Sequence, residues 1–228
     1  MSTSAANSGA HRSERWPLDW SLYLITDRRQ CSEHGVPATV EAAVAGGVTA
    51  VQLRDPNATD EELTQLGREL VSLLAGSHIP LLINDRVDLV EAIGADGAHI
   101  GQSDVSVTQA RRTLGADSLL GLSISTEAEL DAARNEAPAA IDYLGIGPVW
   151  STASKPDHTA PIGVTGLSEL TAASPWPVVA IGGIGLEQIA PVRATGVDGV
   201  AVISAVCSAS DPQKASHDLR RAWEGASR

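Results

Sequence analysis

Two acidic residues of this sequence follow runs of apolar residues. Asp85 comes directly after the run 80–84, and Asp104 follows the run 97–100 after three polar or small residues. Two carboxylates that lie close together repel each other, and a divalent cation between them removes the repulsion. Mg²⁺ takes carboxylate oxygens and keeps positions for water and substrate phosphate. The pattern predicts a Mg²⁺ site at Asp85 and Asp104; the alternative is that each acid caps the helix after it.

Small residues suggest a phosphate site nearer the C-terminus. Gly183 ends the run 177–183, and Ile203 and Ser204 end the run 199–204. Backbone N–H groups at such turns, together with the N-terminus of a short helix, often bind phosphate in α/β barrels. The alternative is an ordinary tight turn, since glycine is common after strands.

The segment 150–164 is long, polar and rich in Ser, Thr and Pro. Loops of this kind are often functional lids, and Lys155 on it is a cation that could close on an anionic substrate or could simply be solvated. Trp150, at the start of the segment, could contact a flat substrate. His99 lies within an apolar run, so we expect a hydrogen-bonded core or rim histidine and not a metal ligand.

The elements that must position these residues alternate along the chain. Eight apolar runs are typical of strands buried on both faces of a parallel sheet; they cover residues 22–26, 49–53, 80–84, 97–100, 119–124, 142–147, 177–183 and 199–204. Segments with helical spacing follow them, at residues 37–47, 59–76, 87–95, 106–116, 126–137, 165–173, 186–196 and 211–226. Thr59 and Glu62 predict a capping box, and Pro191 predicts a short or kinked helix.

This alternation predicts a single-domain α/β protein, a (β/α)₈ TIM barrel with its chemistry at the C-terminal ends of the strands. An open doubly wound sheet is the alternative, but no G-x-G-x-x-G motif follows the first run. We expect a disordered tail over residues 1–17 and the barrel over residues 18–226.

Composition excludes several classes of protein. The net charge is −12, from 16 basic and 28 acidic residues, which argues against a nucleic-acid or anionic-membrane partner. No apolar run approaches the ~18 residues of a membrane-spanning helix. Two cysteines are too few for a disulfide framework, so we expect free thiols in a cytoplasmic protein.

Seven motifs in order closely resemble those of the thiamine phosphate synthase family, over about residues 22–206. They are LYLITD, GGVTAVQLRD, LINDRVDL, GAHIGQSD, DYLGIGPVWSTASK, PVVAIGGI and GVAVIS. The resemblance implies a transferase that joins hydroxymethylpyrimidine diphosphate to hydroxyethylthiazole phosphate, giving thiamine phosphate and pyrophosphate. It also implies Mg²⁺ as cofactor and small phosphorylated molecules as ligands, and a homo-oligomer is compatible with it.

The same resemblance assigns site residues. Those implied for the pyrimidine diphosphate are Gln52, Leu53, Arg54, Asp55, Pro56, Asn84, Ser123 and Lys155, with Arg54, Ser123 and Lys155 as catalytic groups. Those implied for the thiazole phosphate are Thr152, Ala153, Ser154, Gly183, Ile203 and Ser204. Asp85 and Asp104 are the implied Mg²⁺ ligands.

The chain departs from the family pattern. The second strand usually ends Gln-Leu-Arg-Glu-Lys, whereas Asp55-Pro56 ends it here, so one cation is missing. Ser125 stands where the family often has His, and Ser154 where it often has Thr. Two alternatives therefore stay open: a thiazole tautomerase-like relative, and a barrel that binds a thiazole phosphate without catalysis.

Overall fold

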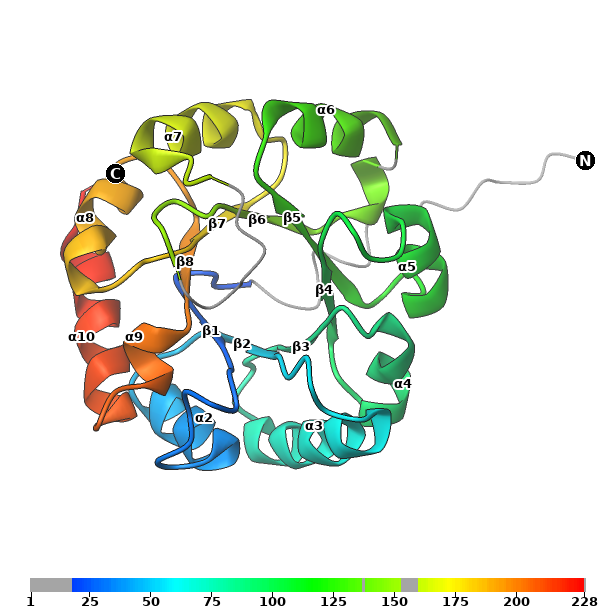
Figure 1. Ribbon diagram of the computed structural model, residues 1–228, viewed down its shortest axis with the longest axis vertical. Coiled ribbons are helices and arrows are strands. Elements are labelled where there is room, and N and C mark those ends of the chain that lie inside the picture. Colours follow the sequence, from blue (N-terminus) through cyan, green and yellow to red (C-terminus); the bar gives the residue numbers. More distant parts are fainter. Residues whose placement is uncertain (1–17, 137, 153–159, 228) are drawn as a thin grey trace, which may run out of the picture.

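The strands of this protein close into a parallel barrel. The computed structural model describes residues 18–136, 138–152 and 160–227, and within them eight strands pair in the order β1-β2-β3-β4-β5-β6-β7-β8, with β8 pairing back to β1 (Figure 1). Helices surround the barrel on its outside (Figure 1). The predicted TIM barrel is confirmed, and the open doubly wound sheet is excluded. Within the described ranges, no helix is both long and apolar enough to cross a membrane.

The strand positions agree with the predicted apolar runs to within a few residues. The strands are β1 (Leu22–Ile25), β2 (Ala50–Leu53), β3 (Leu81–Asn84), β4 (Gly97–Ile100), β5 (Leu119–Ile124), β6 (Tyr143–Ile146), β7 (Val178–Ile181) and β8 (Gly199–Val202). The predicted runs are longer than several of these strands because they include residues of the flanking loops, at the N-terminal end of some strands and at the C-terminal end of others.

Each predicted helical segment overlaps an observed α-helix, and α9 is a further short helix that was not among the predicted segments. The α-helices are α2 (Val36–Ala45), α3 (Asp60–Leu74), α4 (Val90–Ile93), α5 (Val107–Leu114), α6 (Glu127–Glu136), α7 (Gly163–Ala173), α8 (Ile189–Arg193), α9 (Ser204–Cys207) and α10 (Pro212–Gly225). Short 3₁₀ turns are η1 (Val87–Leu89), η2 (Pro138–Ala140) and η3 (Leu186–Gln188). The capping box is confirmed by reciprocal bonds between Thr59 and Glu62, and the helix that contains Pro191 is short.

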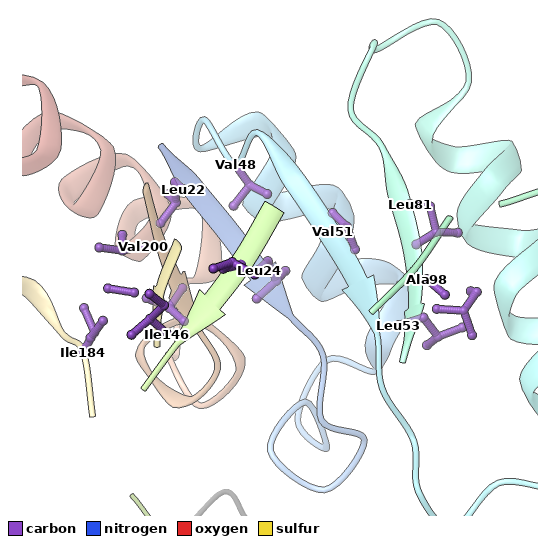
Figure 2. Packing of buried hydrophobic residues seen from close by; sticks show 14 of the residues in the cluster. Leu22, Leu24, Val48, Val51, Leu53, Leu81, Ala98, Ile146, Ile184 and Val200 are labelled. Carbon is purple, nitrogen blue, oxygen red and sulfur yellow. The ribbon is translucent and has the colours of Figure 1, made fainter. Parts of the chain in front are cut away.

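Strand alternation divides the core into two parts. One set of side chains points outward and packs under the helices, and it includes Leu22, Val51, Leu53 and Leu81 (Figure 2). The other set fills the barrel interior; it comprises Trp20, Tyr23, Ile25, Ala50, Leu82, Tyr143, Val179 and Ala201. Successive residues of a strand face opposite sides of the sheet. Every second residue after an inward-facing one therefore also faces inward, and the last of these lie at the barrel mouth, which is the end formed by the C-terminal ends of the strands.

Polar side chains connect the strands in pairs at the N-terminal end of the barrel. The carboxylate of Asp96 accepts the N–H of Leu81, and those of Asp142 and Asp198 accept the N–H groups of Leu120 and Val178. The Thr49 hydroxyl does the same for Leu22. Each bond connects the start of an odd-numbered strand to the residue before the next even-numbered strand. These four side chains therefore hold the strands together in pairs at the end of the barrel opposite the mouth.

Candidate active site

The two predicted metal ligands lie at the ends of neighbouring strands. β3 and β4 pair in parallel, with Asn84 opposite His99, and the Asp85 N–H donates to the His99 carbonyl at 2.9 Å. The Asp104 carboxylate folds back onto the end of β4, where Oδ2 accepts the Gly101 N–H at 2.7 Å. Both acids are exposed. The two acids therefore lie at the ends of adjacent strands at the barrel mouth.

The alternative that these acids cap helices is wrong. The residue before η1 is Arg86, the N-cap of α4 is Leu89, and the N-cap of α5 is Ser106, whose hydroxyl accepts a backbone N–H of that helix. Asp85 has a φ of 64°, in the left-handed region that Asp tolerates better than most residues. Strand alternation alone would direct this side chain under the helices, and the left-handed turn interrupts that alternation.

The donor chemistry of this pair fits Mg²⁺. Two exposed carboxylates supply hard oxygen ligands and leave most of an octahedral shell to water or to substrate phosphate, which is how proteins commonly hold this ion. Within residues 18–136, 138–152 and 160–227, no group of three or more His, Cys, Asp or Glu side chains is arranged to hold a metal. A zinc-type centre is thus absent from the described residues.

Arg54 is the cation that β2 delivers to the mouth. Its backbone is fixed on both sides by Thr26, which accepts the Arg54 N–H at 3.0 Å and donates to its carbonyl at 3.4 Å. Its guanidinium lies 3.7 Å from the Asp27 carboxylate, and both side chains are about nine-tenths buried. Since a guanidinium has five N–H donors, one contact with Asp27 can orient it and still leave donors for an anion.

Asp55 and Pro56 belong to a braced loop. One oxygen of Asp55 accepts the Arg28 Nε–H, and the other accepts the Asn57 N–H at 3.3 Å. Arg28 is half-exposed and comes from the loop after β1. Asp55 is therefore already bound to a cation, Arg28, and to the backbone of its own loop.

Leu53 and the end of the loop that joins β2 to α3 have structural roles. The Leu53 side chain is buried in the outer core, so only its backbone could reach a substrate. Arg86, which follows Asp85, donates to the Ala58 carbonyl at 3.1 Å and pairs with Asp60 at the start of α3. The Asn-Asp-Arg motif thus also fixes the loop between β2 and α3.

Gln52 and Ser123 are inward-facing residues whose side chains reach the same hydrogen-bond network. Gln52 is buried and donates to the Tyr23 hydroxyl at 2.9 Å. Ser123 is half-buried and contacts the His99 Nε2 at 2.9 Å. His99 is hydrogen-bonded at both ring nitrogens, with Tyr143 at Nδ1, which confirms that it is a bonded interior histidine.

The predicted phosphate turns lie on neighbouring strands. β7 and β8 are paired as far as Ile181 and Ala201, and Gly183 and Ile203 lie two residues beyond these partners, just past the ends of the strands. Ile203 is the N-cap of α9, the short helix that begins at Ser204. The arrangement brings the backbone of both turns to one side of the mouth.

Gly183 has two reasons to be glycine. Its φ is 67°, and an added Cβ would lie 2.7 Å from the Trp150 Cβ and 3.0 Å from the Ser151 carbonyl oxygen. The Trp150 N–H donates to the Gly182 carbonyl at 3.0 Å, so the loop after β6 starts against this turn. Trp150 and Ser151 therefore lie against the Gly183 turn, and Thr152 is the next residue of the chain. Ala153, Ser154 and Lys155 lie outside the described residues.

Comparisons with known proteins show the family of this chain. A family model described as thiamine monophosphate synthase matches residues 22–206. The thiamine-phosphate synthase of Psychrobacter sp. is 50% identical over 199 residues, 87% of this chain and 93% of that protein. The chain belongs to the thiamine-phosphate synthase family. The synthase of Azorhizobium caulinodans is 45% identical over 93% of this chain and 99% of its own.

A solved structure of the family has the same fold. Thiamine phosphate pyrophosphorylase from Pyrococcus furiosus superposes with a TM-score of 0.82 at 36% identity, covering 91% of this chain and 96% of that one. The chain thus shares its family and its fold with known thiamine-phosphate synthases.

Several residues near this site were not predicted as site residues from the sequence. Asp27 pairs with Arg54, and Arg28 pairs with Asp55. Tyr23 is hydrogen-bonded to Gln52, and Tyr143 is linked to Ser123 through His99. The parity of the strands is the signal that could have found the tyrosines, because both are polar-tipped residues at inward positions of otherwise apolar runs.

Proposed function

We propose that this chain condenses hydroxymethylpyrimidine diphosphate with hydroxyethylthiazole phosphate. The C–O bond between the pyrimidine methylene and the diphosphate breaks, and pyrophosphate leaves with the electron pair. The thiazole nitrogen then forms the new N–C bond through its own lone pair, so no general base is needed. The family assignment supports this reaction, and the joint presence of Arg54, Asp85 and Asp104 at one mouth is the observation that carries it.

In this proposal Arg54 stabilises the negative charge that grows on the departing diphosphate. A cation that is already oriented stabilises such charge without reorganising during the reaction, and Asp27 and Thr26 supply the orientation. Lys155 is proposed as a second cationic contact from the loop after β6. Gln52, Asn84 and Ser123 would hold the pyrimidine ring, and Leu53, Asp55 and Pro56 would shape the loop beside the diphosphate.

Asp85 and Asp104 are proposed to hold Mg²⁺ together with diphosphate oxygens. When bound, the ion would neutralise charge on the leaving diphosphate. The two carboxylates would hold the ion beside the ends of β3 and β4, within a protein whose net charge of −12 would otherwise oppose an anionic substrate.

The thiazole phosphate is proposed to bind across the barrel mouth. Backbone N–H groups of Gly183 and of the Ile203-Ser204 turn would hold its phosphate. Thr152, Ala153 and Ser154 are proposed to bind the same group. The paired exits of β7 and β8 support this assignment. Both cysteines are free thiols, which suits the proposed cytoplasmic enzyme.

The tautomerase-like alternative requires the thiazole site and not the diphosphate and metal apparatus. Pro56 favours it, since proline lacks the charge of the usual lysine. Arg54, Asp85 and Asp104 favour the synthase, because a tautomerase would have no use for them.

The test is formation of thiamine phosphate from the two purified substrates, with Mg²⁺ and with a chelator. The proposal expects product only with the ion, and a strong loss of turnover in Arg54→Ala. Calorimetric titration of the thiazole phosphate without Mg²⁺ separates the alternatives. Binding of the thiazole phosphate without any product under all conditions would refute synthase activity and favour the non-catalytic barrel.

A further inference from the structure

A line of hydrogen bonds crosses the barrel interior. Gln52 Nε2 lies 2.9 Å from the Tyr23 hydroxyl, which lies 3.0 Å from the Tyr143 hydroxyl. The Tyr143 hydroxyl lies 2.8 Å from His99 Nδ1, and His99 Nε2 lies 2.9 Å from the Ser123 hydroxyl. Two proposed pyrimidine-binding residues, Gln52 on β2 and Ser123 on β5, are therefore connected through side chains of β1, β6 and β4.

Glycines make room for this line. A Cβ on Gly121 would lie 2.2 Å from Tyr143 Cζ and 2.4 Å from His99 Nδ1, and one on Gly145 would lie 3.0 Å from His99 Cε1. Trp20 stacks on Tyr143 at 4.2 Å between ring centroids. The rings thus occupy space that larger residues on β5 and β6 would fill, and they have little freedom to turn away.

The hydrogens along the line can be assigned by counting. Burial raises the pKa of both Tyr23 and Tyr143, so each phenol is neutral and has one hydrogen to donate. A buried hydrogen without an acceptor is costly. Each of the four contacts needs one hydrogen, and only two arrangements supply it to all four. Either all bonds run from Gln52 to Ser123, or all run the other way with Gln52 accepting through its carbonyl oxygen.

The orientation of Gln52 selects the first arrangement. Because Nε2 of Gln52 donates to Tyr23, the Tyr23 hydrogen goes to Tyr143 and the Tyr143 hydrogen goes to His99 Nδ1. Neutral histidine has one N–H, so His99 must have its hydrogen on Nε2 and donate it to Ser123. The Ser123 hydroxyl then accepts from His99 and has its own hydrogen available for the half-exposed mouth.

We infer that Tyr23, Tyr143 and His99 are positioning residues that give Gln52 and Ser123 opposite hydrogen-bonding character. Gln52 offers its carbonyl oxygen as an acceptor, and Ser123 offers a donor. An aminopyrimidine carries amino hydrogens and ring nitrogens with lone pairs, so it matches both. This inference rests on the proposed function and deepens it, because it assigns the line to pyrimidine recognition and not to the thiazole phosphate.

The first test reads the His99 tautomer in the protein without substrates. Nitrogen-15 NMR of the histidine rings, with the His99 signals identified by their loss in His99→Gln, should show Nε2 as the protonated nitrogen and Nδ1 as the unprotonated one. Tyr143→Phe removes the hydroxyl while retaining the ring that stacks on Trp20, and it should shift the His99 signals toward a tautomer mixture. A protonated Nδ1 in the wild type, or an unchanged tautomer in Tyr143→Phe, would overturn the inference.

The second test measures steady-state kinetics for each substrate. In Tyr143→Phe, kcat/KM for the pyrimidine diphosphate should fall about 10- to 100-fold, as is typical when a partner behind a binding group is lost. KM for the thiazole phosphate should change by less than about twofold. Thr49→Val is the matched control, because it removes a hydrogen-bonded hydroxyl from the opposite end of the barrel.

The outcomes separate this inference from the proposed function. Equal losses for both substrates in Tyr143→Phe, or equal effects of Tyr143→Phe and Thr49→Val, would mean that the line is only structural and would overturn the inference. If the wild type makes no thiamine phosphate, the proposed function fails, while the His99 tautomer still decides whether the hydrogens are ordered as assigned.

Discussion

Replacing Asp104 by Asn tests the proposed metal site with little disturbance of the fold. The Asn side chain retains an oxygen that can accept the Gly101 N–H, which the Asp104 carboxylate now accepts at 2.7 Å, and it loses the negative charge. Asp104 is exposed and is not the N-cap of α5. The free energy of unfolding should therefore change by less than about 0.5 kcal/mol.

The loss of activity should be much larger than the loss of stability. An anionic ligand that holds Mg²⁺ on the leaving diphosphate contributes about as much as one preorganised electrostatic donor, about 2.7–4 kcal/mol, or roughly 10²- to 10³-fold in kcat/KM. Asp85→Asn should behave alike, since Asn tolerates the φ of 64° at this position. The double variant should lose less than the sum, because both carboxylates act on one ion.

The assay is steady-state turnover as a function of Mg²⁺ concentration, with thermal unfolding measured beside it. Both variants should need more Mg²⁺ for half-maximal activity than the wild type. Asp88→Asn is the matched control, because Asp88 is an exposed acid of the same loop region, and it should change neither quantity. Turnover that resists a chelator and both substitutions would refute the metal assignment.

Three other predictions use contacts described above. Arg28→Ala should lower kcat/KM for the pyrimidine diphosphate more than Arg28→Lys, because it leaves the Asp55 charge uncompensated beside the proposed diphosphate site; equal values would remove Arg28 from the electrostatics. Burial raises the pKa of Asp96 above its ordinary value of 3.8, so the folded state binds this proton more tightly and stability falls as pH rises through the interval just above that value. Asp96→Asn should flatten this slope in urea melts at a series of pH values. Cys31 and Cys207 are buried and should react with a thiol reagent only after unfolding; rapid reaction of the native protein would contradict their burial.

The barrel could be predicted because its strands are buried on both faces. Runs such as 119–124 and 199–204 contain few polar residues, and that pattern persists whatever the partner strands are. The positions of Asp85 and Asp104 near the ends of their strands were also predictable, because position after an apolar run is a local property of the sequence. Their neighbourhood followed from the order of the strands alone.

The contacts around the site could not be predicted in the same way. Tyr23 and Tyr143 meet across 120 residues of sequence, so their bond depends on the register of strands that share no local pattern. The pairing of Arg28 with Asp55 depends on how two loops bend after β1 and β2. The left-handed φ of Asp85 is likewise a backbone event that its residue type allows but does not require.

The bonds at the N-terminal end of the barrel have a consequence for how the chain is assembled. Thr49, Asp96, Asp142 and Asp198 each reach back only 27, 15, 22 and 20 residues. The barrel is thus a series of four strand–helix–strand modules. Each module contains one such hydrogen bond, at the N-terminal end of its two strands. Such short loops are cheap to close during folding, and any module can be altered at its opposite end without losing its fastening. The symmetry is kept where the chain is held together and is broken at the mouth, where each module ends in different residues.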